Sequence, residues 1–103
     1  MRMIVFFDLP TITYSDQKEY RKFKKNLINE GFIMMQESVY CKLALNMSVV
    51  NSMKVKIDKF KPQNGLIQLL VITEKQYASI DYVIGTNSNN KIDSTDRLVI
   101  LWN

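Results

Sequence analysis

The sequence predicts an α+β fold whose elements follow the order βαββαβ, with one additional strand at the end of the chain. Three segments are strongly apolar runs of strand length, namely residues 2–8, 66–73 and 97–103. Two other segments, 15–30 and 47–60, place apolar residues three or four positions apart, which is typical of helices that bury one face. This order predicts a ferredoxin-like sandwich, with both helices on one face of an antiparallel sheet. The 103 residues contain no repeat and no linker, so we expect a single domain over 1–103.

The first strand, residues 2–8, is expected at the centre of the sheet. Side chains alternate between the two faces of a strand. Both faces are apolar here, with Met3, Val5 and Phe7 on one and Ile4 and Phe6 on the other. Such a strand is covered on both sides.

Asp8 ends this strand on the face that carries Ile4 and Phe6, just before Pro10, which cannot extend a ladder. Burying an unpaired carboxylate costs free energy, so a charge at the edge of an apolar strand needs a partner. That partner is a helix end, a cation on the protein or a bound metal. The residues alone leave these three open.

The first helix is expected from a cap at Ser15 or Asp16 to about Glu30, with Gly31 ending it. Its apolar stripe consists of Tyr20, Phe23, Leu27 and Ile28. Four cationic side chains share the opposite face of the helix: Lys18, Arg21, Lys22 and Lys25.

The positive charge of the chain is concentrated in this helix. Residues 17–25 hold five basic residues and one acidic residue, so they carry the whole net charge of +4. A local excess of this kind suits a polyanion such as nucleic acid. A solvated helix face is the alternative that composition leaves open.

Residues 32–45 alternate like strands and form either one bent strand or two strands that meet near residues 36–38. The second helix, 47–60, is expected to be capped by Asn46 or Ser48. Its outward lysines are interpreted as a solvated face.

After a turn at 61–65 and the strand at 66–73, residues 74–85 are expected to hold a helical turn and a short strand around Ile80–Ile84. The final strand, 97–103, has no place in the βαββαβ plan. An extra apolar strand invites pairing with the sheet edge of a second copy. The sequence therefore predicts a homodimer.

The chain contains no histidine and a single cysteine, Cys41. This excludes a Ser-His triad, an imidazole acid–base pair and a zinc site built from histidine or from several thiolates. Any catalysis must then use carboxylates, hydroxyls, amines and a hard cation such as Mg²⁺.

No apolar span approaches the roughly 20 residues that a bilayer requires, and no cleavable signal segment is recognisable. The lone cysteine agrees with a reducing compartment. We therefore expect a cytoplasmic protein that does not interact with membranes.

Four segments together resemble a known family: "MRMIVFFDLP", "YRKFKKNLINEGFIMMQESVYCKL", "LLVITEKQY" and "RLVILW". The chain is similar over nearly its whole length to the small CRISPR-associated endoribonucleases called Cas2, most closely to the form found in type II-A systems. The middle segment is the most specific, because a helix, a glycine and an "SVY" strand occur in the order of the family.

This resemblance implies a ferredoxin-like homodimer in which Asp8 is the Mg²⁺ site and the catalytic carboxylate, with the two Asp8 residues facing each other across the interface. It also implies a role in acquiring new spacers. The dimer would bridge two dimers of the CRISPR integrase, Cas1, along double-stranded DNA. The resemblance further implies a possible activity as a metal-dependent ribonuclease or deoxyribonuclease, which several members of the family are assigned.

On this interpretation the cations of the first helix contact DNA phosphates, which positions a duplex without reading its sequence. Three hydroxyl side chains are supporting candidates: Tyr14, expected in a loop, and Ser38 and Tyr40 of the "SVY" stretch. Packing is the alternative role for both tyrosines.

The sequence thus favours a DNA-bridging adaptation protein and leaves open whether it is also a Mg²⁺-dependent endonuclease acting on DNA or RNA. The alternatives are a stand-alone, toxin-like ribonuclease and a ferredoxin-like module that binds RNA or regulates another protein.

Overall fold

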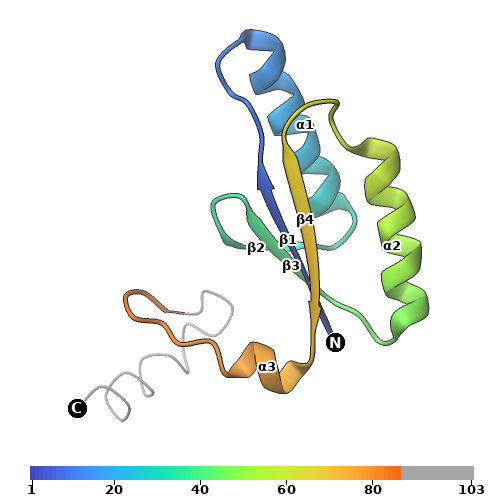
Figure 1. Ribbon diagram of the computed structural model, residues 1–103, viewed down its shortest axis with the longest axis vertical. Coiled ribbons are helices and arrows are strands. Elements are labelled where there is room, and N and C mark those ends of the chain that lie inside the picture. The colour runs from blue at the N-terminus through green and yellow to red at the C-terminus, as the bar shows by residue number, and fades with distance from the viewer. Residues whose placement is uncertain (87–103) are drawn as a thin grey trace.

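The computed structural model describes residues 1–86. Their elements are β1 (Arg2–Asp8), α1 (Tyr14–Asn29), β2 (Ile33–Gln36), β3 (Val39–Leu43), α2 (Met47–Phe60), β4 (Leu66–Ile72) and α3 (Glu74–Ala78) (Figure 1). The strands form one antiparallel sheet in the order β2-β3-β1-β4. The βαββαβ prediction is confirmed, and the strand expected at 97–103 lies outside the described residues. None of the helices in this part of the chain could cross a bilayer.

The core lies between the sheet and the two long helices, which cover the same face of the sheet (Figure 1). Met3, Val5 and Phe7 of β1 are buried against Phe23 and Leu27 of α1 and against the inner side of α2. This is the face that alternation along β1 predicts. Apolar stripes on two helices and three inward side chains of the central strand therefore account for the sandwich.

The opposite face of the sheet is covered at one end and open elsewhere. Tyr77 of α3 packs over Ile4 and Cys41. An ion pair between Arg2 Nε and Glu74 Oε2, at 3.0 Å, joins α3 to β1. The exposed apolar side chains of this face are Ile33, Leu43, Leu66 and Leu70, which we call the open face. In the register Ile33 lies beside Cys41 and Leu70 beside Ile4, whereas Leu66 lies beside Asp8. The expectation that β1 is covered on both sides is therefore confirmed only near its start.

Three local expectations are wrong. The cap of α1 is Thr13, because Thr13 Oγ1 accepts from the Asp16 backbone N–H while Asp16 Oδ2 accepts from the Thr13 N–H, a reciprocal box that satisfies two donors. Tyr14 is consequently the first residue of the helix and not a loop residue. The short strand around Ile80–Ile84 is absent from the described sheet, and Val83 and Ile84 are 88% and 94% exposed.

The remaining alternatives are settled by the backbone. The 32–45 segment forms two strands, joined by a tip at Glu37–Ser38 that contains a residue of positive φ, Ser38 (φ 64°). The cap of α2 is Asn46, whose side chain accepts from the Val49 N–H at 3.0 Å. Gly31 follows the end of α1 in a left-handed conformation, as expected.

Candidate functional site

Asp8 is the last residue of β1, and its side chain is exposed. Its place in the alternation puts it on the open face, opposite Leu66 of β4. Among residues 1–86 its carboxylate forms no hydrogen bond or ion pair. Neither a helix end nor a cation of the described chain therefore serves as the partner that the sequence required.

The surroundings of Asp8 fit a hard cation that retains most of its water. Within the described part of the chain, no group of three or more carboxylate, thiolate or imidazole side chains could hold a metal ion. Mg²⁺ commonly binds through one or two carboxylates and several waters, so a single exposed aspartate is compatible with it. Among residues 1–86, Asp8 is the carboxylate that the end of β1 offers for this purpose.

The backbone at Asp8 is held closely by the turn that precedes β4. Gly65 has φ +111°, and a Cβ built there would lie 2.8 Å from Asp8 O and 2.6 Å from Leu9 Cδ2. Only glycine adopts this conformation without strain and leaves room for such an approach. Gly65 therefore allows the turn to close against the end of β1.

A second contact reaches the end of β1 from the other side. The Phe7 N–H donates to Ser38 O at 3.0 Å, which joins the residue before Asp8 to the tip between β2 and β3. The tip itself is bound to α1, because the Tyr20 hydroxyl donates to Glu37 Oε1 at 2.6 Å and lies 3.2 Å from Ser38 Oγ. Lys24 Nζ completes this cluster, 3.5 Å from the same Glu37 oxygen.

Contacts within this cluster shift the pKa values of two of its side chains. Burial raises the pKa of the Tyr20 phenol, and the hydrogen bond with Glu37 raises it further. The same hydrogen bond, followed by the charge of Lys24, lowers the pKa of the Glu37 carboxyl. At neutral pH the phenol is therefore a donor and the carboxylate an acceptor.

The outer side of α1 is the candidate nucleic-acid interface. All four cations assigned to this interface are exposed, and none of them has an ion-pair partner within residues 1–86. They are Lys18, Arg21, Lys22 and Lys25. Lys24 belongs to the same basic segment but turns to Glu37 and to the Tyr20 ring, 5.1 Å from its centroid. Since α1 covers the core side of the sheet, this interface and Asp8 lie on opposite sides of the sheet.

The three supporting candidates have different surroundings. Tyr14 is 76% exposed at the start of α1, so both of its expected roles, nucleic-acid contact and packing at the surface, stay predictions. The Ser38 hydroxyl faces Tyr20. Tyr40 is only 1% exposed and stacks on Phe7, with 5.6 Å between ring centroids, so it supports the site by packing and cannot reach a ligand at the surface.

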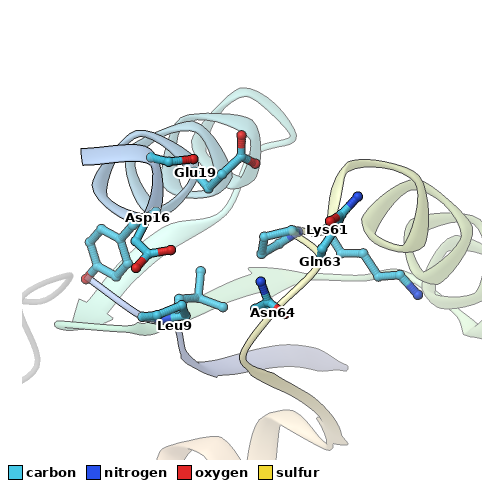
Figure 2. A pocket seen from close by; sticks show the side chains of 10 residues that line it. Leu9, Asp16, Glu19, Lys61, Gln63 and Asn64 are labelled. Atoms are coloured by element: carbon cyan, nitrogen blue, oxygen red, sulfur yellow. The ribbon is translucent and has the colours of Figure 1, made fainter. Parts of the chain in front are cut away.

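A pocket of about 440 Å³ lies next to the end of β1 and was not anticipated from the sequence. Figure 2 shows Asp16 and Glu19 on its α1 side, with Leu9 below and Asn64 on the opposite side. Its walls come from residues 9–20 and 61–64, two stretches far apart in the chain, so no local pattern indicates it. Lys61 also lines it, although the ammonium pairs with Asp58 at 2.7 Å. Asp8 is not among its lining residues.

Comparisons with known proteins agree with this architecture. A model of the CRISPR associated protein Cas2 family matches residues 1–80. A CRISPR-associated endoribonuclease Cas2 of Treponema denticola is 48% identical over 101 residues, covering 98% of this chain and all of the relative. The Streptococcus mutans protein of the same name is also 48% identical, covering 98% of this chain and 93% of its own.

A structural comparison supports the fold. The crystal structure of Streptococcus pyogenes Cas2 at pH 6.5 superposes with a TM-score of 0.63 at 17% identity, covering 82% of this chain and all of the other. At this identity the likeness establishes the fold alone. The family match and the relatives that align over almost the whole chain show that the chain belongs to the Cas2 family of CRISPR-associated proteins.

Proposed function

We propose that this protein acts in CRISPR adaptation as a homodimer that binds double-stranded DNA and bridges dimers of the integrase Cas1 while new spacers are inserted. The observation that carries the proposal is the exposed, unpaired row of cations on α1. Contacts from such a row to phosphates fix the position of a duplex and carry no sequence information. Indifference to sequence suits a protein that must accept any foreign fragment.

The homodimer is supported by the opposite side of the molecule. The open face leaves four large apolar side chains about half exposed, and exposed apolar surface is typical of protein interfaces. β4 pairs only with β1 in the described sheet, and Leu66–Ile72 contains no charge and no proline to protect its free edge. We propose that a second copy covers this face and edge, with its apolar 97–103 segment added to β4.

We further propose that Asp8 binds Mg²⁺ and that the dimer has phosphodiester endonuclease activity; the relatives are named endoribonucleases. A two-fold axis through the open face would bring a second Asp8 to the site, giving the two carboxylates that Mg²⁺ accepts. When bound, the cation supplies an activated water and neutralises charge on the phosphodiester. Asp8 itself holds the cation at the end of β1.

The family match favours this CRISPR role over a stand-alone ribonuclease or a ferredoxin-like RNA-binding regulator. Within the CRISPR role, bridging requires only a dimer and a basic surface, whereas catalysis requires one carboxylate per chain to support hydrolysis. We therefore regard bridging as the primary function and cleavage of RNA or DNA as the additional one.

The test is reconstitution with purified Cas1 and a duplex, comparing the native chain with Asp8→Asn. We expect Asp8→Asn to remove any Mg²⁺-dependent cleavage of RNA and DNA and to leave Cas1 binding and spacer integration intact. Loss of integration in a folded Asp8→Asn dimer would make the reaction at Asp8 essential to adaptation. A native chain that stays monomeric with Cas1 and DNA present would refute bridging.

A further inference from the structure

We infer that Tyr20 is a positioning residue for Asp8, acting through the β2–β3 tip on the backbone that carries the carboxylate. The inference rests on the proposed metal role of Asp8 for its functional meaning. Its structural part depends only on contacts within residues 1–86. Tyr20 comes from α1 and does not touch the site, so it is not a catalytic residue.

The first step concerns the conformation of the tip. Ser38 is the one residue of 1–86 other than glycine with a positive φ, at 64°. A left-handed serine is unfavourable by itself and persists where the surrounding structure holds it in place. The β2–β3 pairing is also irregular here, since the register shifts between Met34 and Gln36. The two strands alone therefore leave the tip weakly determined.

The second step is that α1 supplies the contacts that hold the tip. The Tyr20 hydroxyl binds Glu37 at 2.6 Å and approaches the Ser38 hydroxyl at 3.2 Å, so one phenol reaches both tip residues. The Tyr20 ring is fixed in turn by Phe7, with 6.0 Å between ring centroids. Lys24 neutralises Glu37 from the next turn of α1. Together these contacts hold the tip against α1.

The third step links the tip to Asp8. Ser38 O accepts the hydrogen bond of the Phe7 N–H at 3.0 Å, and Phe7 directly precedes Asp8. On the other side, Gly65 closes against Asp8 O. The last residues of β1 are thus held on one side by pairing with β4 and by the Gly65 turn, and on the other side by the tip, which depends on Tyr20.

This arrangement predicts a specific consequence of removing the phenol hydroxyl. Tyr20→Phe keeps the ring against Phe7 but frees Glu37 and Ser38, so the tip relaxes and the Phe7–Ser38 hydrogen bond opens more often. The backbone that carries Asp8 is then less restrained. Residues that orient a metal ligand without touching the metal typically contribute 10- to 100-fold to metal affinity. We expect Tyr20→Phe to weaken divalent-cation binding by about tenfold.

The experiment combines two measurements on the intact protein. Hydrogen exchange of the Phe7 amide reports the tip contact, and titration with Mn²⁺ as the probe, followed by water relaxation, reports the Asp8 site. The variants are Tyr20→Phe, Glu37→Ala at an exposed position and the matched control Tyr77→Phe, which makes the same change in α3. We expect about tenfold faster Phe7 exchange and tenfold weaker Mn²⁺ binding in Tyr20→Phe and Glu37→Ala, and native values in Tyr77→Phe.

The outcomes separate the inference from the proposed function. Phe7 exchange that is the same in Tyr20→Phe, Glu37→Ala and Tyr77→Phe overturns the inference, whatever Mn²⁺ does. Faster exchange with native Mn²⁺ affinity also overturns it, because positioning is then irrelevant to the site. If the native chain binds Mn²⁺ no better than Asp8→Asn, the proposed metal role fails, while the exchange data still decide whether Tyr20 fixes the end of β1.

Discussion

Lys24 and Lys25 are neighbours in α1 with opposite surroundings. The ammonium of Lys24 lies 3.5 Å from Glu37 Oε1 and over the Tyr20 ring, whereas Lys25 is exposed and has no ion-pair partner in residues 1–86. A cation that already faces a carboxylate has less to gain from a phosphate. The basic segment is therefore divided by the fold into an interface and a structural contact.

This division predicts different effects of two adjacent alanine substitutions on DNA binding. Lys25→Ala should weaken duplex affinity and reduce the slope of log affinity against log salt by about one, because one phosphate contact is lost. Lys24→Ala should leave the slope unchanged. Fluorescence anisotropy of a labelled duplex at several salt concentrations measures both. Equal losses in the two variants would contradict the assignment of the interface.

Reversal of charge at the centre of the interface should have a larger effect. The double substitution Arg21→Glu and Lys22→Glu replaces two attractions by two repulsions, so duplex affinity should fall by well over tenfold at moderate salt. The matched control reverses Lys54 and Lys59 of α2, which makes the same change in net charge. Gel-shift titration of the folded dimers compares the two. A comparable loss in the control would show that total charge matters and its placement does not.

Acid should weaken the cluster at the β2–β3 tip. The folded pKa of Glu37 lies below its usual 4.5, so the contact contributes stability above that value and loses it as pH falls through the folded pKa. Glu37→Gln removes the titrating group. We expect the native chain to exceed Glu37→Gln in melting temperature at neutral pH, and the difference to shrink below about pH 4. A constant difference from pH 3 to pH 7 would argue against the contact.

Much of the fold could be predicted because it depends on local patterns. Alternation gave the bounds of β1, and three- and four-residue spacing located both long helices. The failures have physical causes. Residues 80–84 resemble a strand but form none in the described sheet. The cap of α1 depends on a reciprocal Thr13–Asp16 contact, which several nearby polar residues could also have formed.

The candidate site was only partly predictable. Its cations follow from helical spacing, and Asp8 follows from its position after an apolar strand. The cluster of Tyr20, Glu37 and Lys24 could not be predicted, because it depends on where the tip meets α1, and that is set by packing of the whole sheet on the helices. The close approach of Gly65 to Asp8 could not be predicted either, because it too depends on how distant segments pack.

Gly65→Ala should destabilise the protein strongly and disturb the end of β1. The new methyl group would lie 2.8 Å from Asp8 O at a φ of +111°, which combines steric overlap with backbone strain. Together these cost roughly 2–4 kcal/mol. Gly85→Ala is a matched control, because Gly85 also has positive φ but no atom of residues 1–86 lies within 4 Å of its built Cβ. We expect it to cost under about 1 kcal/mol in denaturant unfolding, since the exposed chain can relax. Equal costs would mean that strain alone matters.

A charge placed on the open face should abolish the proposed dimer. Leu70 pairs with Ile4 in the sheet register and is 48% exposed, whereas Val55 of α2 is 56% exposed on the other side of the molecule. Leu70→Lys would bury an unpaired ammonium in the interface, so we expect the dissociation constant of the dimer to rise at least tenfold, about 1.4 kcal/mol. Val55→Lys adds the same charge outside the interface and should leave the dimer intact. Analytical ultracentrifugation of both variants over a range of concentrations decides the matter, since a dimer that survives Leu70→Lys must be built on another surface.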